Sequence, residues 1–190
     1  RSDGRTPCIP GSAANNAGTL LGGDVRLRRD GVEIKHHLGV SGFATHTVVD
    51  RRSVVPVGDD VPPAVAAVLG CAVLTGGGAL LNAASPVEGD TIMVVGLGGV
   101  GMAAVLTAAS LGLGDVIGVD SMPEKLETAR ELGATSVYTP QELAESDVRA
   151  QIVVEAAGNA RAFETALAAT APGGTTVTEG LPSPDARASI

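Results

Sequence analysis

The spacing of hydrophobic and polar residues divides the chain into segments with different expected structures. Residues 1–18 are rich in Gly, Pro, Asn and Ser, which predicts a loop. Residues 24–37 alternate apolar and charged side chains on both sides of Arg29-Asp30-Gly31, which predicts a β-hairpin with one solvent-facing side. Two further strands are expected to complete a small antiparallel region that ends at residue 58: 43–50 and 53–58.

Beyond Pro62-Pro63 the period becomes helical. Residues 64–69 and 72–85 are rich in Ala and Leu, which predicts short helices. Glycine has low helix propensity, so we expect these helices to be broken at Gly70 and at Gly76-Gly77-Gly78.

From residue 91 onward, short apolar strands alternate with helices. The pattern predicts strands at 91–95, 116–119, 135–138, 151–158 and 173–180, and helices at 100–111, 124–132 and 160–169. The helix at 124 has marked ends, because Ser121 and Glu124 fit a capping box and Gly133 stands where the helix should stop. This alternation predicts an α/β fold with a Rossmann-type doubly wound parallel sheet.

Two uncharged runs, 61–87 and 91–114, are each long enough to cross a bilayer, which takes about 20 apolar residues. The first contains Gly76-Gly77-Gly78 and three prolines, and the second contains six glycines. Such residues leave backbone groups unsatisfied in lipid, and the flanks carry acidic side chains without Lys or Arg. The sequence therefore favours a cofactor-binding turn over a membrane span.

The segment GLGGVG at 96–101 matches the G-x-G-x-x-G motif at a predicted strand-to-helix junction. Gly96 permits the tight turn, Gly98 allows a pyrophosphate to approach the backbone, and Gly101 allows the helix to pack on the strand. Unpaired N–H groups at the helix start attract phosphate, so an acidic protein can still hold this anion. The remaining positions of the predicted phosphate-binding loop are Gly99 and Val100.

Asp120 ends the second predicted strand, 19 residues after Gly101. A carboxylate there accepts hydrogen bonds from both ribose hydroxyls of NAD and repels a 2′-phosphate, and Ser121 and Met122 follow without an arginine. The sequence thus predicts NAD rather than NADP. An ordinary solvated loop carboxylate is the alternative for Asp120.

Charge and cysteine content narrow the range of partners and compartments. The formal net charge of −8 disfavours nucleic acid and anionic membrane surfaces, so we expect neither as a partner. Two cysteines do not make a disulfide framework, and no secretory leader is recognised, which predicts a cytoplasmic protein. The start at Arg1 and the Pro/Ser-rich end lead us to expect a piece of a longer protein.

Four segments together resemble the zinc-dependent medium-chain alcohol dehydrogenases. They are GRTPC at 4–8, HHLGVSGFATHTVVD at 36–50, LGCAVLTGGGALLNAASPVEGD at 69–90 and the strand with GLGGVG that follows. The resemblance spans residues 4–182 and implies two domains: part of a β-rich, GroES-like catalytic domain at 1–70, and an NAD-binding Rossmann domain at 71–190, incomplete at its C-terminus.

The resemblance also implies roles for single residues. Cys71 matches the third protein ligand of the catalytic zinc, and Cys8 matches a cysteine of a structural zinc lobe. Thr75 matches a residue beside the nicotinamide, and the backbone of Leu181 falls where the carboxamide is bound. Asp120 and Lys125 match residues that hold the adenosine ribose.

Catalytic zinc needs three protein ligands and one open position, and the family's remaining ligands and its proton relay fall before Arg1. No catalytic residue is therefore assigned, and the chain alone is predicted to be inactive. Alternatives for Cys71 are an inert thiol or a disulfide with Cys8. The histidines His36, His37 and His46 are expected to occupy surface or loop positions, and the residues present do not identify the substrate alcohol.

The resemblance implies an oxidoreductase that transfers hydride between a small-molecule alcohol and NAD with a catalytic zinc, and a homo-oligomer in the intact protein. Two alternatives stay open. One is a zinc-free medium-chain reductase acting on quinones or enoyl groups. The other is a non-catalytic NAD-binding module.

Overall fold

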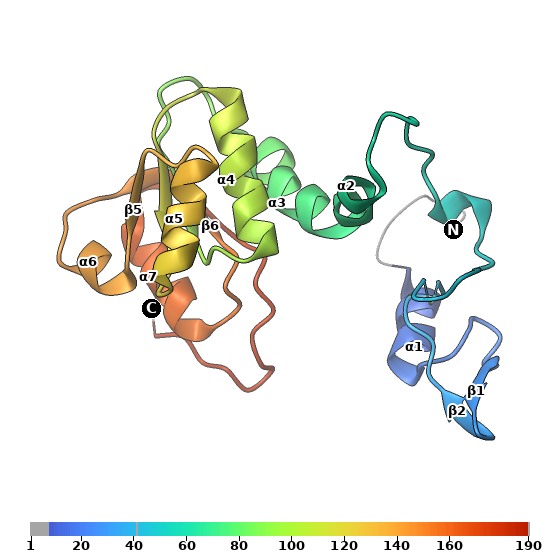
Figure 1. Cartoon of the computed structure of the whole chain (residues 1–190). Coiled ribbons are helices and arrows are strands. Elements are labelled where there is room, and N and C mark those ends of the chain that lie inside the picture. Colours follow the sequence, from blue (N-terminus) through green and yellow to red (C-terminus); the bar gives the residue numbers. More distant parts are fainter. Residues whose placement is uncertain (1–7, 41, 190) are drawn as a thin grey trace. The chain divides into compact units, whose positions relative to one another are not determined.

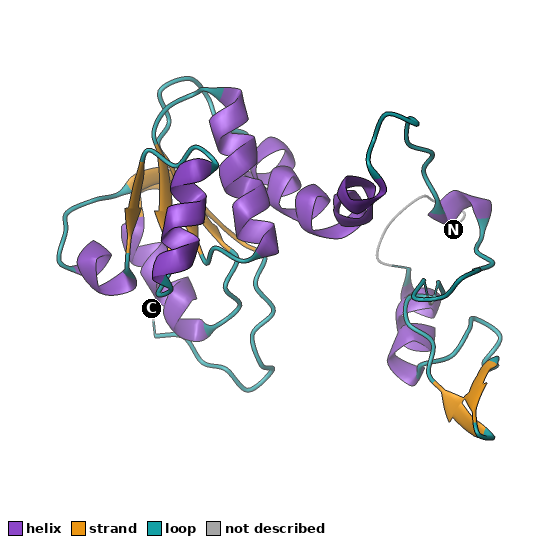
Figure 2. Cartoon of the chain, viewed as in Figure 1, coloured by secondary structure: helices purple, strands orange, loops and turns teal. Residues whose placement is uncertain are grey.

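The computed structural model describes residues 8–40 and 42–189 (Figure 1). The chain forms two compact units, Arg1–Gly58 and Asp59–Ile190. Figure 2 shows that the second unit contains a sheet flanked by helices, and that the strands of the first unit are confined to one short hairpin.

The first unit contains a helix that the sequence did not predict. Helix α1 spans Ile9–Ala17, within the segment expected to be a loop; residues 1–7 of that segment lie outside the described residues. Pro10 occupies the first turn, where its missing N–H costs nothing, and Gly18 ends the helix in the left-handed conformation at φ 72°. The loop prediction is wrong for this stretch because two helix-end signals outweigh its polar composition.

The hairpin is confirmed: β1 Leu27–Arg29 pairs antiparallel with β2 Val32–Ile34 around Asp30 and Gly31. All six strand residues are exposed, so both faces of the hairpin contact solvent. The strands predicted at 43–50 and 53–58 do not form, and the described residues there include one 3₁₀ turn, Arg51–Ser53. Pro56 lacks an N–H for a ladder, and exposed side chains such as Val48 and Val55 have no core to cover.

The second unit is built on five strands in the order β5-β4-β3-β6-β7, and all neighbouring pairs are parallel. The strands are β3 Ile92–Val95, β4 Val116–Val119, β5 Ser136–Tyr138, β6 Ala150–Glu155 and β7 Thr170–Thr178. When the five strands are renumbered 1 to 5 along the chain, starting at β3, their order across the sheet is 3-2-1-4-5. This is the doubly wound arrangement, in which the direction of winding reverses between β3 and β6. The predicted Rossmann-type sheet is confirmed.

Helices cover both faces of the sheet. They are α4 Gly99–Leu111, α5 Pro123–Glu131, α6 Pro140–Ala144 and α7 Ala160–Ala169. Successive residues of β3 point to opposite faces: Ile92 and Val94 join a core with α4 and α5, whereas Met93 and Val95 join a core with α6 and α7. Burial on both sides explains why these strands are continuously apolar in sequence.

Residues 63–84 form one helical segment: α2 Pro63–Val68, a π-helical turn Leu69–Val73, α3 Leu74–Gly78 and a second π-helical turn Ala79–Ala84. The predicted breaks at Gly70 and Gly76-Gly77-Gly78 are wrong. A Cβ at Gly76 would overlap the Val100 carbonyl oxygen and lie 2.8 Å from the Ala104 amide nitrogen. This glycine therefore brings the segment close to α4 instead of ending the helix.

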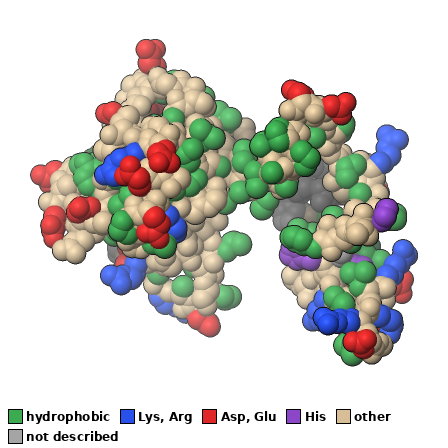
Figure 3. All heavy atoms as spheres, viewed as in Figure 1, with side chains coloured by type: hydrophobic (Ala, Val, Ile, Leu, Met, Phe, Trp, Pro, Cys, Tyr) green, Lys and Arg blue, Asp and Glu red, His purple; other side chains and the backbone are tan. Residues whose placement is uncertain are grey.

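By length and a mean hydropathy of 2.1, Pro63–Ala84 could cross a membrane, which by itself is weak evidence for a span. Only 17% of its most apolar window is buried. Hydrophobic side chains cover its outer surface, as Figure 3 shows, and they include Val65, Val68, Leu74 and Leu81.

Capping differs from the expectation at α5, and α6 has a capping box for which no prediction was made. The capping box predicted at Ser121 is wrong, because Met122 is the N-cap residue of α5 and the Oδ1 atom of Asp120 accepts the Met122 N–H at 3.0 Å. A capping box does form at Thr139 of α6, whose hydroxyl and N–H bond Glu142. The Thr139 backbone N–H holds the pKa of the Glu142 carboxyl below its ordinary value, and the Thr139 hydroxyl adds to this effect.

Candidate cofactor site

The turn after β3 requires glycine at its first position. Gly96 has φ 96°, in the left-handed region, and a Cβ there would lie 2.5 Å from the Ala157 amide nitrogen. The Gly96 N–H donates to the Val119 carbonyl at 2.8 Å, which fixes the turn against the end of β4. Strain and close packing together exclude any side chain at this point.

Gly98 and Gly101 have different surroundings, as the sequence predicted. Gly98 is the N-cap residue of α4 in extended conformation, and a Cβ there would meet no atom within 4 Å. A Cβ at Gly101 would instead overlap the Gly96 carbonyl oxygen. Gly101 is thus needed for packing, whereas the space over Gly98 is open to a ligand.

The start of α4 is suited to an anion. No side chain caps this end, and no acidic residue lies in the first turn. The first N–H groups of a helix have no partner within the helix, and they carry its positive dipole end. The backbone of Gly99 and Val100 therefore offers donors to a phosphate group.

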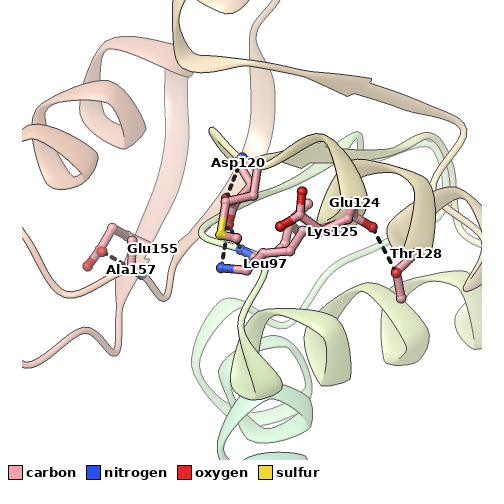
Figure 4. A network of polar contacts seen from close by, with 8 residues as sticks. Leu97, Asp120, Glu124, Lys125, Thr128, Glu155 and Ala157 are labelled. Atoms are coloured by element: carbon pink, nitrogen blue, oxygen red, sulfur yellow. Dashed lines mark hydrogen bonds and ion pairs between the residues drawn. The ribbon is translucent and has the colours of Figure 1, made fainter.

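Asp120 follows β4 and lies directly against the turn (Figure 4). Its Oδ2 atom accepts the Leu97 N–H at 2.8 Å, and the ammonium group of Lys125 lies 3.5 Å from the same oxygen. The Asp120 side chain is 9% exposed, so it is not an ordinary solvated loop carboxylate. The glycine turn, the Asp120 carboxylate and the Lys125 ammonium group are thus neighbours in the structure.

The segment that carries Thr75 packs on the same turn. A Cβ at Gly99 would make ordinary contact with Ala72 at 3.8 Å, and Gly76 contacts α4 as described above. Thr75 lies between these two contacts on α3 and is half-buried. Its position is fixed by backbone packing against the helix that begins at the glycine turn.

The two cysteines lie in different units of the chain. Cys71 is exposed on the first π-helical turn, Cys8 precedes α1 in the other unit, and both are free thiols. Among residues 8–40 and 42–189, no group of three His, Cys, Asp or Glu side chains is placed to hold a metal ion, and His36, His37 and His46 all lie in the first unit. These residues by themselves do not fit a zinc ion.

Leu181 follows β7 and is 94% exposed. A Cβ at Gly158, which has φ 73°, would lie 3.0 Å from the Leu181 amide nitrogen. The backbone of Leu181 therefore adjoins the turn that follows β6, at the same sheet edge as the glycine turn.

Two acidic residues at this edge were not singled out from the sequence. Glu155 is 1% exposed at the end of β6, in register with Val95 of β3. Glu179 has a buried Oε2 atom without a hydrogen-bond partner, and burial raises the pKa of this carboxyl. The available signal was a glutamate directly after QIVV, because a charge at the end of a buried strand requires an explanation.

A hollow of about 430 Å³ lies at the opposite edge of the sheet, lined by residues at the amino ends of strands such as Thr91, Asp115 and Arg149. Ligands of open α/β sheets bind at the carboxyl ends of the strands. The candidate site is accordingly the glycine turn and its neighbours.

Comparisons with known proteins agree with this geometry. Residues 99–190 match the family model described as "Zinc-binding dehydrogenase". Alcohol dehydrogenase class-3 of Drosophila melanogaster is 34% identical over 177 residues, which cover 87% of this chain and 47% of that protein. The chain spans less than half the length of the curated relatives it matches, between 42% and 47%.

Solved structures give the same result. An alcohol dehydrogenase zinc-binding domain protein from Burkholderia ambifaria superposes with a TM-score of 0.82 and 26% identity, covering 98% of this chain and 55% of its own. Acetophenone reductase from Geotrichum candidum, solved in complex with NAD, has a TM-score of 0.62 and 31% identity, covering 69% of this chain and 38% of its own. In strand order, in the glycine turn and in sequence, the chain is therefore similar to the zinc-dependent medium-chain alcohol dehydrogenases, as its motifs predicted.

Proposed function

We propose that this chain binds NAD at residues 96–101. In the intact protein, hydride would pass between an alcohol and this NAD, so that the alcohol becomes an aldehyde or ketone. The observation that carries the proposal is the contact between Asp120 and the glycine turn, at 2.8 Å from the Leu97 N–H. A phosphate-binding turn and a ribose-binding carboxylate then lie side by side at the point where the strand order reverses.

Each residue has a defined part in this proposal. The N–H groups at the start of α4 bind the pyrophosphate, and the bare backbone of Gly98 lets it approach. Asp120 accepts hydrogen bonds from the adenosine ribose, with Lys125 beside it. Thr75 and the Leu181 backbone adjoin the nicotinamide. When bound, NAD supplies the hydride-accepting ring, and these residues orient it and shield it from water.

Zinc enters the proposal through the two cysteines, Cys71 and Cys8. We assign Cys71 as one ligand of a catalytic zinc whose other ligands lie outside residues 8–40 and 42–189, and Cys8 as one ligand of a structural zinc. Because the described residues do not complete either set, we expect the 190-residue chain to show no turnover with an alcohol and NAD.

Calorimetric titration of the chain with NAD and with NADP tests the proposal. We expect NAD to bind more tightly, because Asp120 would repel a 2′-phosphate. The variant Gly98→Val should lose binding, since its side chain would fill the space needed by the pyrophosphate. Gly70→Val is the matched control, because a Cβ at Gly70 also meets no atom within 4 Å and lies on the helical segment outside the site.

Equal or tighter binding of NADP would contradict the cofactor assignment. Unchanged NAD affinity in Gly98→Val would show that this turn does not hold the cofactor. A cytoplasmic location, a homo-oligomeric state and a domain boundary between residues 70 and 71 remain predictions from the sequence and its resemblance.

A further inference from the structure

Glu155 is the one buried charged residue among those described, with 1% of its surface exposed. It ends β6, an interior strand of the sheet, in register with Val95 of β3 on one side and with Thr178 of β7 on the other. No Lys or Arg forms an ion pair with it within the described part of the chain. A buried carboxylate without a counter-ion is costly, so its retention calls for a reason beyond packing.

The carboxylate is satisfied by three hydrogen bonds from two different segments. Oε1 accepts the Ala157 N–H at 2.9 Å and the Gly158 N–H at 2.7 Å, and Oε2 accepts the Thr178 hydroxyl at 2.7 Å. Figure 4 shows the bond to Ala157 beside the glycine turn. Glu155 thereby joins the turn after β6 to the end of β7.

Both joined segments border the proposed cofactor groove. Ala157 packs on Gly96, where an added Cβ would lie 2.6 Å from the Ala157 Cβ. Gly158 packs against Gly180 and the Leu181 amide. A continuous series of backbone contacts therefore runs from the glycine turn to Leu181, and the Glu155 carboxylate fixes its middle.

The two halves of the groove are held by different carboxylates. Asp120 lies on the side of β3 and β4, where a doubly wound sheet binds the first nucleotide of a dinucleotide, here the adenosine half. Glu155 lies on the side of β6 and β7, where such a sheet binds the second nucleotide, here the nicotinamide half. Resting on the proposed function, we propose that Glu155 is a positioning residue for the nicotinamide half of the cofactor: it holds the turn at Ala157 and Gly158 against the end of β7.

This proposal predicts that loss of the carboxylate affects the two halves unequally. Glu155→Met keeps the side-chain volume but removes both acceptors, so the Ala157 and Gly158 N–H groups lose their partner. By calorimetry, NAD affinity should fall roughly tenfold or more, as expected when buried donors are left unpaired, while the affinity for AMP changes by less than about twofold.

Glu155→Gln is the conservative variant. Its carbonyl oxygen can accept both N–H groups and its amide can donate to the Thr178 hydroxyl, so NAD affinity should stay within about threefold of wild type. Val153→Ala, a buried change on the same strand, is the control for lost stability and should leave the ratio of NAD to AMP affinity unchanged.

Hydrogen exchange gives a second readout that does not depend on a ligand. The Ala157 and Gly158 amides should be protected in the wild type and in Glu155→Gln. Should Glu155→Met fail to fold, Thr178→Val removes one of the three donors and should lower the NAD to AMP affinity ratio by a smaller factor.

The outcomes separate the two proposals. A wild-type chain that binds neither AMP nor NAD contradicts the proposed function and this inference together. A wild type that binds both, with Glu155→Met weakening both equally or neither, contradicts the role of Glu155 alone. Rapid exchange of the Ala157 and Gly158 amides in the folded wild type, or an unchanged ratio in Thr178→Val, also overturns it.

Discussion

The two uncharged segments of the chain, 61–87 and 91–114, look alike in sequence and differ in the structure. The second forms β3, the glycine turn and α4, and its strand is completely buried between two helical layers. The first is a helical segment whose most apolar window is 17% buried. Leu80 is inaccessible, whereas Leu74 and Leu81 are 67% and 55% exposed.

The difference shows that apolar composition measures the potential for burial and not burial itself. In the second segment, parallel strands on both sides and helices on both faces cover every apolar position of β3. In the first, one face packs on α4 and the other contacts solvent in the described structure. Substitutions in the two segments should therefore have unequal effects on stability.

The largest effect is expected from Gly101→Val in the second segment. Its side chain would overlap the Gly96 carbonyl oxygen, and backbone cannot move aside as a flexible side chain does. We expect the free energy of unfolding, measured by urea titration, to fall by about 3 kcal/mol. Gly98→Ser, in open space and at an N-cap position that suits serine, should leave it unchanged or slightly higher. Equal losses in the two variants would refute the assigned packing.

The next-largest effect on the free energy of unfolding is expected in the first segment, where it should differ between the buried and the exposed face. Leu80→Ala should lower the free energy of unfolding by about 3 kcal/mol, because it leaves a cavity in the core shared with α4. Leu81→Ala, one residue later and 55% exposed, should change it by less than about 0.5 kcal/mol. Similar losses in the same titration would mean that the outer face is covered in solution.

A smaller effect on stability, with a clear effect on surface properties, is expected from Leu74→Gln combined with Leu81→Gln. Both side chains are exposed on the helical segment, so the unfolding midpoint should not move. Fluorescence of a dye that binds apolar surface should decrease relative to wild type. The same double change made at Leu27 and Val32 of the hairpin serves as the control for exposed residues outside the segment.

The last comparison concerns α6, a short polar helix outside both apolar segments. Thr139→Ala removes the cap and should cost about 1 kcal/mol. Because the folded pKa of Glu142 is lowered from 4.5, its contribution is complete above that pH and is lost as the pH falls through the folded value. Urea midpoints measured below pH 5 should therefore depend less on pH in Thr139→Ala. Thr128→Ala, whose hydroxyl bonds within α5, should keep the wild-type slope.

Much of the second unit could be predicted because local pattern and tertiary burial agree there. The helix at 160–169 and the strand at 116–119 have the predicted bounds, and the distinct environments of Gly98 and Gly101 follow from the motif. The confirmed hairpin at Asp30 and Gly31 likewise depends on a local turn signal.

The remaining errors concern features that depend on distant partners. Strands at 43–50 and 53–58 need a sheet to pair with, which no local pattern supplies. The capping box predicted for α5 is wrong because the Met122 N–H donates to the Asp120 carboxylate and Ser121 is not the N-cap residue. The role of Glu155 depends on Thr178, which is adjacent only after β6 and β7 pair. Each case is decided by contacts between residues far apart in the chain or by competition between neighbouring side chains.

The contact between Gly76 and the first turn of α4 sets how precisely Cys71 is placed. Since no side chain separates the two helices there, backbone atoms alone fix their spacing, and rotamer changes cannot adjust it. The backbone of the segment that carries Cys71 is thereby held close to the start of α4. A methyl group at residue 76 would push the segment that carries Cys71 away from α4, and under the proposed function this would move a zinc ligand away from the nucleotide site.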